Sequence, residues 1–244
     1  MSDLLIKLWQ NGILQLGIWE TIYMTLISTF FAYLIGLPVG LILRMTDRDG
    51  IHPIGWLNRT LGIIVNALRS IPFIILMVAM LPVAKFVVGT SLGNRAVIVT
   101  LVIAAAPYVA RMVESAAKEV DAGVIEAAQS MGASTFQIIW KVYLPEAKPS
   151  LVLGGAISIV TILAYTAMAG SVGGGRLGDI AIRYGHQRGI TSVMWVTVVI
   201  LIVLVQIVQS FFSWLTKKID KRQRTDQSAD FTPLQFLAHF THTK

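Results

Sequence analysis

The sequence contains no cysteine and is poor in charged residues. None of its 244 residues is Cys, and only 14% of them are Asp, Glu, Lys or Arg. A soluble domain usually carries about a quarter charged residues. The missing thiols exclude disulfides and thiolate-bound metals, and the low charge argues against a soluble globular chain.

Motifs for ATP hydrolysis and for catalysis within a membrane are also missing. No stretch shows GxxxxGK followed by Ser or Thr, the phosphate-binding loop of ATPases. The segment GGGRLG at 173–178 satisfies GxGxxG, but it follows an apolar stretch instead of a strand, so we predict a turn and no dinucleotide site. His52, His186, His239 and His242 lie outside the long apolar stretches. We expect no enzymatic activity, cofactor or metal in this chain.

The sequence is rich in long apolar stretches. Hydrophobic residues make up 55% of the chain, and its mean hydropathy is +0.70. Since about 20 apolar residues cross a bilayer, we searched for runs of that length. Five stretches qualify: 18–43, 57–88, 96–117, 149–170 and 191–215. We predict an all-α integral membrane protein with five transmembrane helices and no cleavable signal peptide.

The charges suggest how the chain divides and how it is oriented. Lys and Arg accumulate in cytoplasmic loops, and most of them here fall within 44–59, 111–148 and 217–224. We therefore predict an outside N-terminus and a cytoplasmic C-terminus. The expected divisions are an N-terminal segment 1–17, a transmembrane domain 18–217 and a basic cytoplasmic tail 218–244, to which we assign no function. The net charge of +7 does not indicate nucleic acid, since no reading module is present.

A long charged stretch, residues 118–146, interrupts the apolar runs. Its first half has apolar residues at near-helical spacing, namely Val120, Val124, Ile125, Ala128 and Met131. Asp121 suits the start of this helix, and Gly132 is expected to end it with a positive φ. Ser134 and Gln137 have the spacing of a capping box for a second helix.

That second helix is expected to place its aromatic residues on one stripe, with Pro145 ending it. The stripe comprises Phe136, Ile139, Trp140 and Tyr143. The pattern predicts an amphipathic helix–turn–helix at the cytoplasmic surface. A helix pair lying in the lipid interface is the alternative that the pattern alone leaves open.

Spaced residues within this stretch resemble the EAA loop of ABC-importer permeases. The matching residues are Glu126, Ala127, Ala128, Gly132, Leu144 and Pro145, with Val142 where the family usually has isoleucine. The stretches 66–77, 105–114 and 165–179 are similar to permeases of bacterial methionine importers, and the resemblance extends over about 15–217.

The resemblance implies an ATP-driven importer in the bacterial inner membrane, with methionine as its substrate. It implies a homodimer of this permease, two separate ATP-binding subunits that hold ATP and Mg, and an external methionine-binding lipoprotein or periplasmic protein. The EAA loop would be the coupling helix docked on the ATPase. A permease for another amino acid or a small peptide remains an alternative. An ion-coupled secondary transporter is another, although no carboxylate lies in mid-span as such transporters need.

Arg69 and Pro72 are candidates for a translocation pathway or its gate. Arg69 lies inside the second apolar stretch, where a charge is costly and usually functional. Pro72 is expected to kink or restart the helix. Two interpretations of Arg69 stay open: it braces the gate near the helix break, or its helix lies at the cytoplasmic interface and its side chain extends to water.

The end of the fourth stretch carries small, soft or weakly polar residues, namely Tyr165, Met168, Ala169 and Gly170. Small residues indicate close helix packing. The alternative is a pathway wall, in which Met168 is polarizable enough to contact a thioether substrate. For Gly36 and Gly40, a GxxxG pair around Pro38, we predict helix packing.

Overall fold

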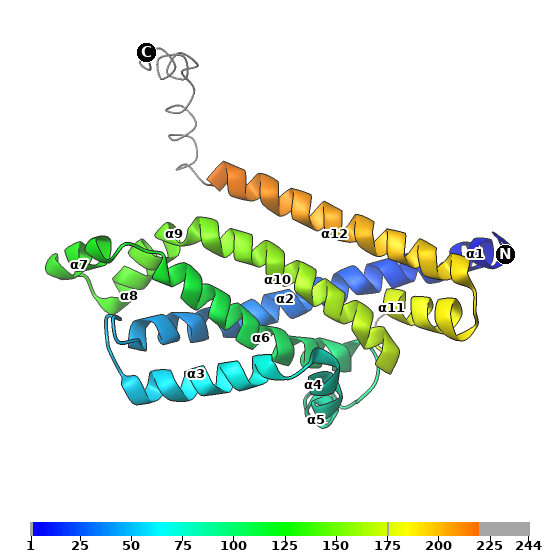
Figure 1. Ribbon diagram of the computed structural model, residues 1–244, viewed down its shortest axis with the longest axis horizontal. Coiled ribbons are helices and arrows are strands. Elements are labelled where there is room, and N and C mark those ends of the chain that lie inside the picture. The colour runs from blue at the N-terminus through cyan, green and yellow to red at the C-terminus, as the bar shows by residue number, and fades with distance from the viewer. Residues whose placement is uncertain (1, 175, 220–244) are drawn as a thin grey trace, which may run out of the picture.

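The computed structural model describes residues 2–174 and 176–219, and this part of the chain is helical, without strands. Four long helices run along the long axis of the molecule (Figure 1): α2 (Ile13–Thr46), α6 (Asn94–Lys118), α10 (Lys148–Ala169) and α12 (Thr191–Ile219). Within the described residues, these four are long and apolar enough to cross a membrane. The all-α membrane architecture is confirmed.

The second expected span, 57–88, is broken into three helices. They are α3 (Gly55–Ser70), α4 (Phe73–Ala79) and α5 (Leu81–Val88), and α3 and α4 meet at a bend of 106°. Pro72 precedes α4, and Ile71 before it is extended (φ −81°, ψ 127°), as sterics require before proline. The predicted kink is confirmed, and a fifth membrane crossing exists only if this bent pair is one span.

Small residues bring α2 and α6 into close contact. A methyl group at Gly36 would lie 2.7 Å from Cβ of Val109, and one at Gly40 would lie 2.4 Å from the carbonyl oxygen of Ala110. Only glycine permits helices to approach in this way. The predicted packing role of the GxxxG pair is confirmed.

Short helices close the two ends of the bundle (Figure 1). One end holds α1 (Ser2–Gln10), the 3-10 turn Gly170–Val172, α11 (Arg176–Ile180) and the π-helix Ala181–Gln187. The other holds α7 (Ala122–Ser130), α8 (Thr135–Ile138), the π-helix Ile139–Tyr143 and α9 (Leu144–Glu146). The predicted turn in GGGRLG begins at Gly173, whose φ is +83°. Residues 220–244 of the expected tail lie outside the described residues.

The largest buried cluster joins the long helices to the second of these ends. It contains Val109 and Val113 of α6, Ile162 of α10, Ile138 of α8 and Tyr143 of the π-helix that follows α8. By contrast, α12 leaves a long apolar face uncovered, including Trp195, Ile202, Ile207, Phe211 and Trp214. The short helices α7–α9 are therefore part of the same packed body as α6 and α10.

Candidate functional site

The α7–α9 module, defined here as residues 119–147, begins with a helix that is capped at both ends. The Asp121 carboxylate accepts a hydrogen bond from the Gly123 amide at 2.7 Å. At the other end Gly132 has φ +76°, its N–H donates to the Gln129 carbonyl at 2.9 Å, and the Ala133 N–H donates to the Ala128 carbonyl at 3.1 Å. This is a Schellman motif, and the predicted end at Gly132 is confirmed.

The second half of the module begins with the predicted capping box. The backbone N–H of Gln137 donates to the Ser134 hydroxyl at 3.4 Å, and the backbone N–H of Ser134 donates to the side-chain oxygen of Gln137 at 2.8 Å. The prediction that Pro145 ends this helix is wrong, because helical structure continues to Glu146. A proline clashes with the carbonyl four residues earlier, and the wider π turn at 139–143 precedes Pro145 and makes room for its ring.

The single apolar faces expected for these helices do not exist. In the first half Ile125 and Ala128 are buried, whereas 44% of Val124 and 81% of Met131 is exposed. Ile125 and Ala128 are three residues apart and share the inward face of a helix that begins only after Val120. Val120 is buried ahead of the helix, so its position does not follow the helical period.

The expected aromatic stripe of the second half is likewise divided. Tyr143 is buried, but Phe136 and Trp140 are 67% and 58% exposed, with ring centroids 5.9 Å apart. The π turn adds a residue to the helical repeat, which separates Tyr143 from the side chains one and two turns earlier. The exposed apolar side chains of the module are thus Val124, Met131, Phe136 and Trp140, which we together call the outer face.

The EAA-like residues fall on both sides of the module. Glu126, Ala127, Gly132 and Pro145 are exposed, Leu144 is half-buried, and Ala128 and Val142 are buried. The motif therefore combines a surface toward solvent with contacts to the bundle. An exposed apolar cluster on a rigid base is typical of a docking surface.

Ion pairs fasten the base of the module to α2 and α6. The Lys118 ammonium lies 2.9 Å from carboxylate oxygens of both Asp47 and Glu114, and the Arg111 guanidinium lies 2.6 Å from the Glu114 carboxylate, three residues along α6. The hydrogen bond from Lys118 is the largest cause that lowers the pKa of Asp47. Glu114 is 4% exposed, so its two cationic partners stabilise a carboxylate that would otherwise be costly to bury.

Two further contacts attach the module itself to the long helices. The His52 ring, in the turn after α2, lies 2.7 Å from the Thr135 hydroxyl. The Ser150 hydroxyl of α10 donates to the Glu119 carboxylate. The module is therefore held by α2, α6 and α10 together.

The pathway candidates lie elsewhere. Arg69 is exposed in the last turn of α3 and has no ion pair among the described residues. Tyr165 stacks on Phe73 of α4, with ring centroids 4.1 Å apart and planes 1° from parallel. Met168 is 45% exposed and lines a cavity of about 610 Å³ between α10, the π-helix 181–187 and α12.

Ala169 and Gly170 occupy packing positions. Ala169 is fully buried, and a methyl group at Gly170 would lie 2.3 Å from the Asp179 amide nitrogen in α11. Ala169 packs with Met24 and Phe73 in a buried cluster, and the small size of Gly170 is required for the contact between the 3-10 turn and α11. Both positions fit close packing, the first of the two interpretations offered by the sequence.

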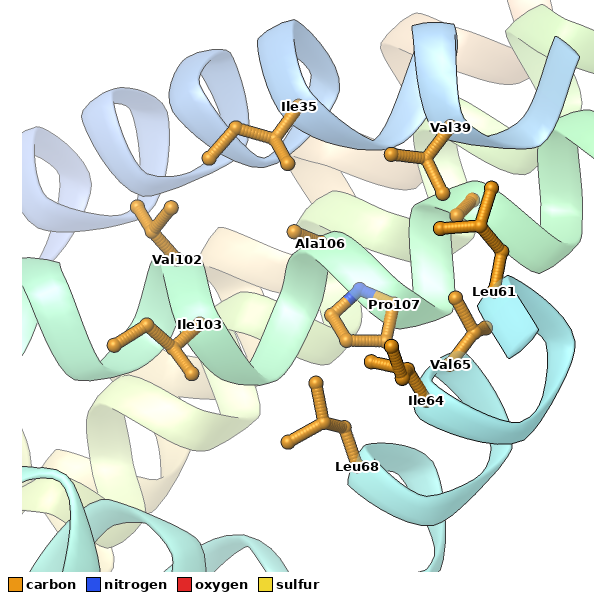
Figure 2. A pocket seen from close by; sticks show the side chains of 11 residues that line it. Ile35, Val39, Leu61, Ile64, Val65, Leu68, Val102, Ile103, Ala106 and Pro107 are labelled. Carbon is orange, nitrogen blue, oxygen red and sulfur yellow. The ribbon is translucent and has the colours of Figure 1, made fainter. Parts of the chain in front are cut away.

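An apolar cavity of about 280 Å³ lies between α2, α3 and α6. Figure 2 shows Ile35 and Val39 from α2, Leu61 and Leu68 from α3, and Pro107 from α6 directed toward it. Its lining is almost wholly apolar, so it offers no group for chemistry or for orienting a polar ligand. Among the described residues, no cluster of three or more His, Asp and Glu side chains is suited to a metal ion.

A polar cavity of about 350 Å³ lies beneath α7 and was not predicted from the sequence. Arg44 and Tyr143 are among the residues that line it. Burial raises the pKa of the Tyr143 phenol, and the nearby Arg44 only partly opposes this. The only signal in the sequence is a single cation, Arg44, in the last turn of an apolar helix.

Curated proteins with similar sequences are named as transport proteins. A Vibrio cholerae protein named probable D-methionine transport system permease protein is 51% identical over 212 residues, which are 87% of this chain and 94% of that protein. The D-methionine transport system permease protein of Escherichia coli K12 is 51% identical over 154 residues, covering 63% of this chain and 71% of that protein.

Solved structures and a family match extend this likeness. A chain of the MetNI methionine ABC transporter in an inward-facing conformation superposes with a TM-score of 0.84 at 45% identity, covering 86% of this chain and 97% of that chain. An amino acid ABC transporter chain shares the fold, with a TM-score of 0.72 at 18% identity. Because residues 36–221 match the family as well, the chain belongs to the binding-protein-dependent transport system inner membrane components.

Proposed function

We propose that this chain is the permease subunit of an ATP-driven methionine importer of the bacterial inner membrane. The observation that carries the proposal is the likeness to a methionine ABC transporter chain, at TM-score 0.84 and 45% identity over 86% of this chain. Two copies would form the pathway, with an outside N-terminus and a cytoplasmic C-terminus. An external methionine-binding protein would deliver the substrate.

In this proposal the α7–α9 module couples the permease to a separate ATPase subunit, two copies of which bind ATP and Mg. The support is local: the outer face leaves Phe136 and Trp140 more than half exposed, while Ile138 and Tyr143 anchor the module in the core. A rigid body with one buried and one uncovered apolar face can transmit the movement of a docked partner. ATP shifts the permease between two states only if the ATPase contacts those states differently.

The pathway would run past the bent pair α3–α4 and the end of α10. The Phe73–Tyr165 stack joins these segments at 4.1 Å, so a change in the bend at Pro72 would move Tyr165. Arg69 and Met168 are exposed on the same segments, α3 and α10. We propose that these residues face the pathway or its gate in the assembled transporter.

Two glycines with matched backbones allow a test of the coupling role. Gly132 in the module and Gly89 after α5 have φ of +76° and +78°, and neither has an atom within 4 Å of an added Cβ. Valine at either position meets the same left-handed strain, about 1–2 kcal/mol. We expect Gly132→Val, but not Gly89→Val, to reduce ATP-driven uptake of labelled methionine at least tenfold in proteoliposomes with the ATPase.

Equal uptake by the two variants, at equal amounts of permease, would contradict the coupling role. Uptake of another amino acid in place of methionine by the wild-type complex would leave the coupling role intact and change only the substrate. A chain that drives uptake without any ATPase would place it among ion-coupled transporters instead.

A further inference from the structure

The polar cavity beneath α7 lies where three parts of the chain meet. It is bounded by the last turn of α2 at Arg44, the following turn at Asp49 and Ile51, the α7 residues Ile125 and Glu126, and Tyr143. Its volume of about 350 Å³ is at the small end of the range of about 300–1,000 Å³ for ligand sites. It is separate from the segments assigned above to the pathway.

Arg44 in this cavity is a buried cation without a counterion. It is 8% exposed, and its Nε atom is buried without a hydrogen-bond partner. Its Nη1 donates to the Asp49 carbonyl oxygen at 3.0 Å, but no ion pair of Arg44 exists among the described residues. The Asp47 carboxylate, which lies within electrostatic range of Arg44, is paired with Lys118. A buried guanidinium is costly unless an anion compensates it.

Tyr143 places a second free donor beside this cation. It is 1% exposed, and its hydroxyl is also buried without a partner. The Arg44 guanidinium carbon lies 5.8 Å from the centroid of the Tyr143 ring. Arg44 and Tyr143 both line the cavity, and a guanidinium and a phenol are donors suited to a carboxylate.

The rim of the cavity has the opposite charge. Asp49 and Glu126 both line it and both are exposed, so a simple anion would pass two carboxylates on its way to Arg44. A ligand that also carries an ammonium group would gain from them. Ile51, Ala122 and Ile125 supply the apolar part of the lining.

We propose that this cavity binds a small zwitterion of the α-amino acid class. Its carboxylate accepts hydrogen bonds from Arg44 and Tyr143, its ammonium group faces Asp49 and Glu126, and its side chain lies against Ile51 and Ile125. The ligand bridges the end of α2 and α7, so its binding holds the α7–α9 module against the bundle. The site is independent of which substrate the permease carries.

Hydrogen exchange of the full-length chain in lipid nanodiscs shows which peptides a bound ligand protects, and it therefore locates the binding site. We expect L-methionine and L-leucine to protect peptides covering 44–51 and 122–129. Methioninamide lacks the carboxylate and N-acetylmethionine lacks the ammonium group, so neither should protect them. Protection confined to peptides around Tyr165 and Met168 would be binding in the pathway and would overturn the proposal, as would equal protection by N-acetylmethionine, which indicates a simple anion site.

Tyr143→Phe removes one unpartnered hydroxyl and keeps the ring. Since that hydroxyl has no partner to lose, we expect the ligand-free variant to melt at an unchanged or higher temperature. Its affinity for methionine at this site should fall about three- to tenfold, the effect of one hydrogen bond. Tyr33→Phe is the matched control, because the Tyr33 hydroxyl contacts Met112 between α2 and α6, 3.7 Å away. Unchanged affinity in Tyr143→Phe would overturn the proposal.

Discussion

At Gly36 and Gly40 the contacts between α2 and α6 leave no room for a Cβ atom, whereas the α7–α9 module leaves four large apolar side chains 44–81% exposed. The helix pair is held by the close approach of glycines to a facing backbone. The module is held by caps, ion pairs and one buried face. A membrane-spanning body and a docking element thus differ less in composition than in whether their second face is already covered.

The largest effect is expected where the α2–α6 contact is broken. A Cβ at Gly40 would lie 2.4 Å from the Ala110 carbonyl oxygen, but one at Gly62 on α3 has only an Arg111 nitrogen at 3.9 Å. Gly40→Ala should therefore lose about 3 kcal/mol of stability through overpacking. Gly62→Ala should change stability little. Melting curves of the two purified variants check this, and similar curves would contradict the close contact.

The next largest effect concerns the buried carboxylate beneath the module. The side chain of Glu114 is 6% exposed and pairs with Arg111 and Lys118. Glu114→Gln removes the carboxylate paired with Arg111 and one of the two paired with Lys118, and we expect a loss of about 1–2 kcal/mol. Asp179→Asn, which breaks the more exposed pair with Arg183, should lose less than about 0.5 kcal/mol. Equal losses would mean that burial does not decide the strength of these pairs.

A smaller effect should appear as a pH dependence. The pKa of Asp47 is lowered in the folded chain, mainly by Lys118. Its contribution is therefore complete above the ordinary aspartate pKa of about 3.9 and is lost as the pH falls through the lowered native value. Because both groups are partly exposed, it should amount to less than about 1 kcal/mol.

Melting curves from pH 6 to pH 3 measure this contribution. The wild type should lose stability relative to Asp47→Asn as the pH falls below the ordinary aspartate pKa, and the two curves should approach each other toward the acid end. Parallel curves would show that the Asp47–Lys118 pair does not stabilise the fold.

Local sequence rules predicted the ends of the module's helices but not its faces. Gly132 and the Ser134–Gln137 box act within a few residues of themselves, so their roles can be read from spacing. Tyr143 is buried while Trp140 is exposed because both lie in a π turn. A prediction based on α-helical periodicity does not include such a turn. Sequence spacing likewise could not predict that Arg44 lies beside Tyr143, since this contact joins the end of α2 to the π-helix 139–143 across about a hundred residues of sequence.

The fold as a whole was easier to predict than its second span. Apolar length identified α2, α6, α10 and α12, because bilayer thickness sets a length that can be counted. The same count joined α3, α4 and α5 into 57–88, although Pro72 marked the break. Proline predicts a bend but not its angle, and the angle of 106° follows from packing against α6 and α10.

The most direct measurement is the affinity of the purified permease for its ATPase subunit after removal of one outer-face tryptophan. Trp140 of the module and Trp195 of α12 are similarly exposed, at 58% and 64%, so Trp140→Ala and Trp195→Ala are matched changes. We predict that Trp140→Ala weakens binding about 30-fold, as loss of a central aromatic contact does, with little change in the stability of the permease alone. Trp195→Ala should bind like the wild type. Wild-type affinity in Trp140→Ala would contradict the role of the outer face as the docking surface.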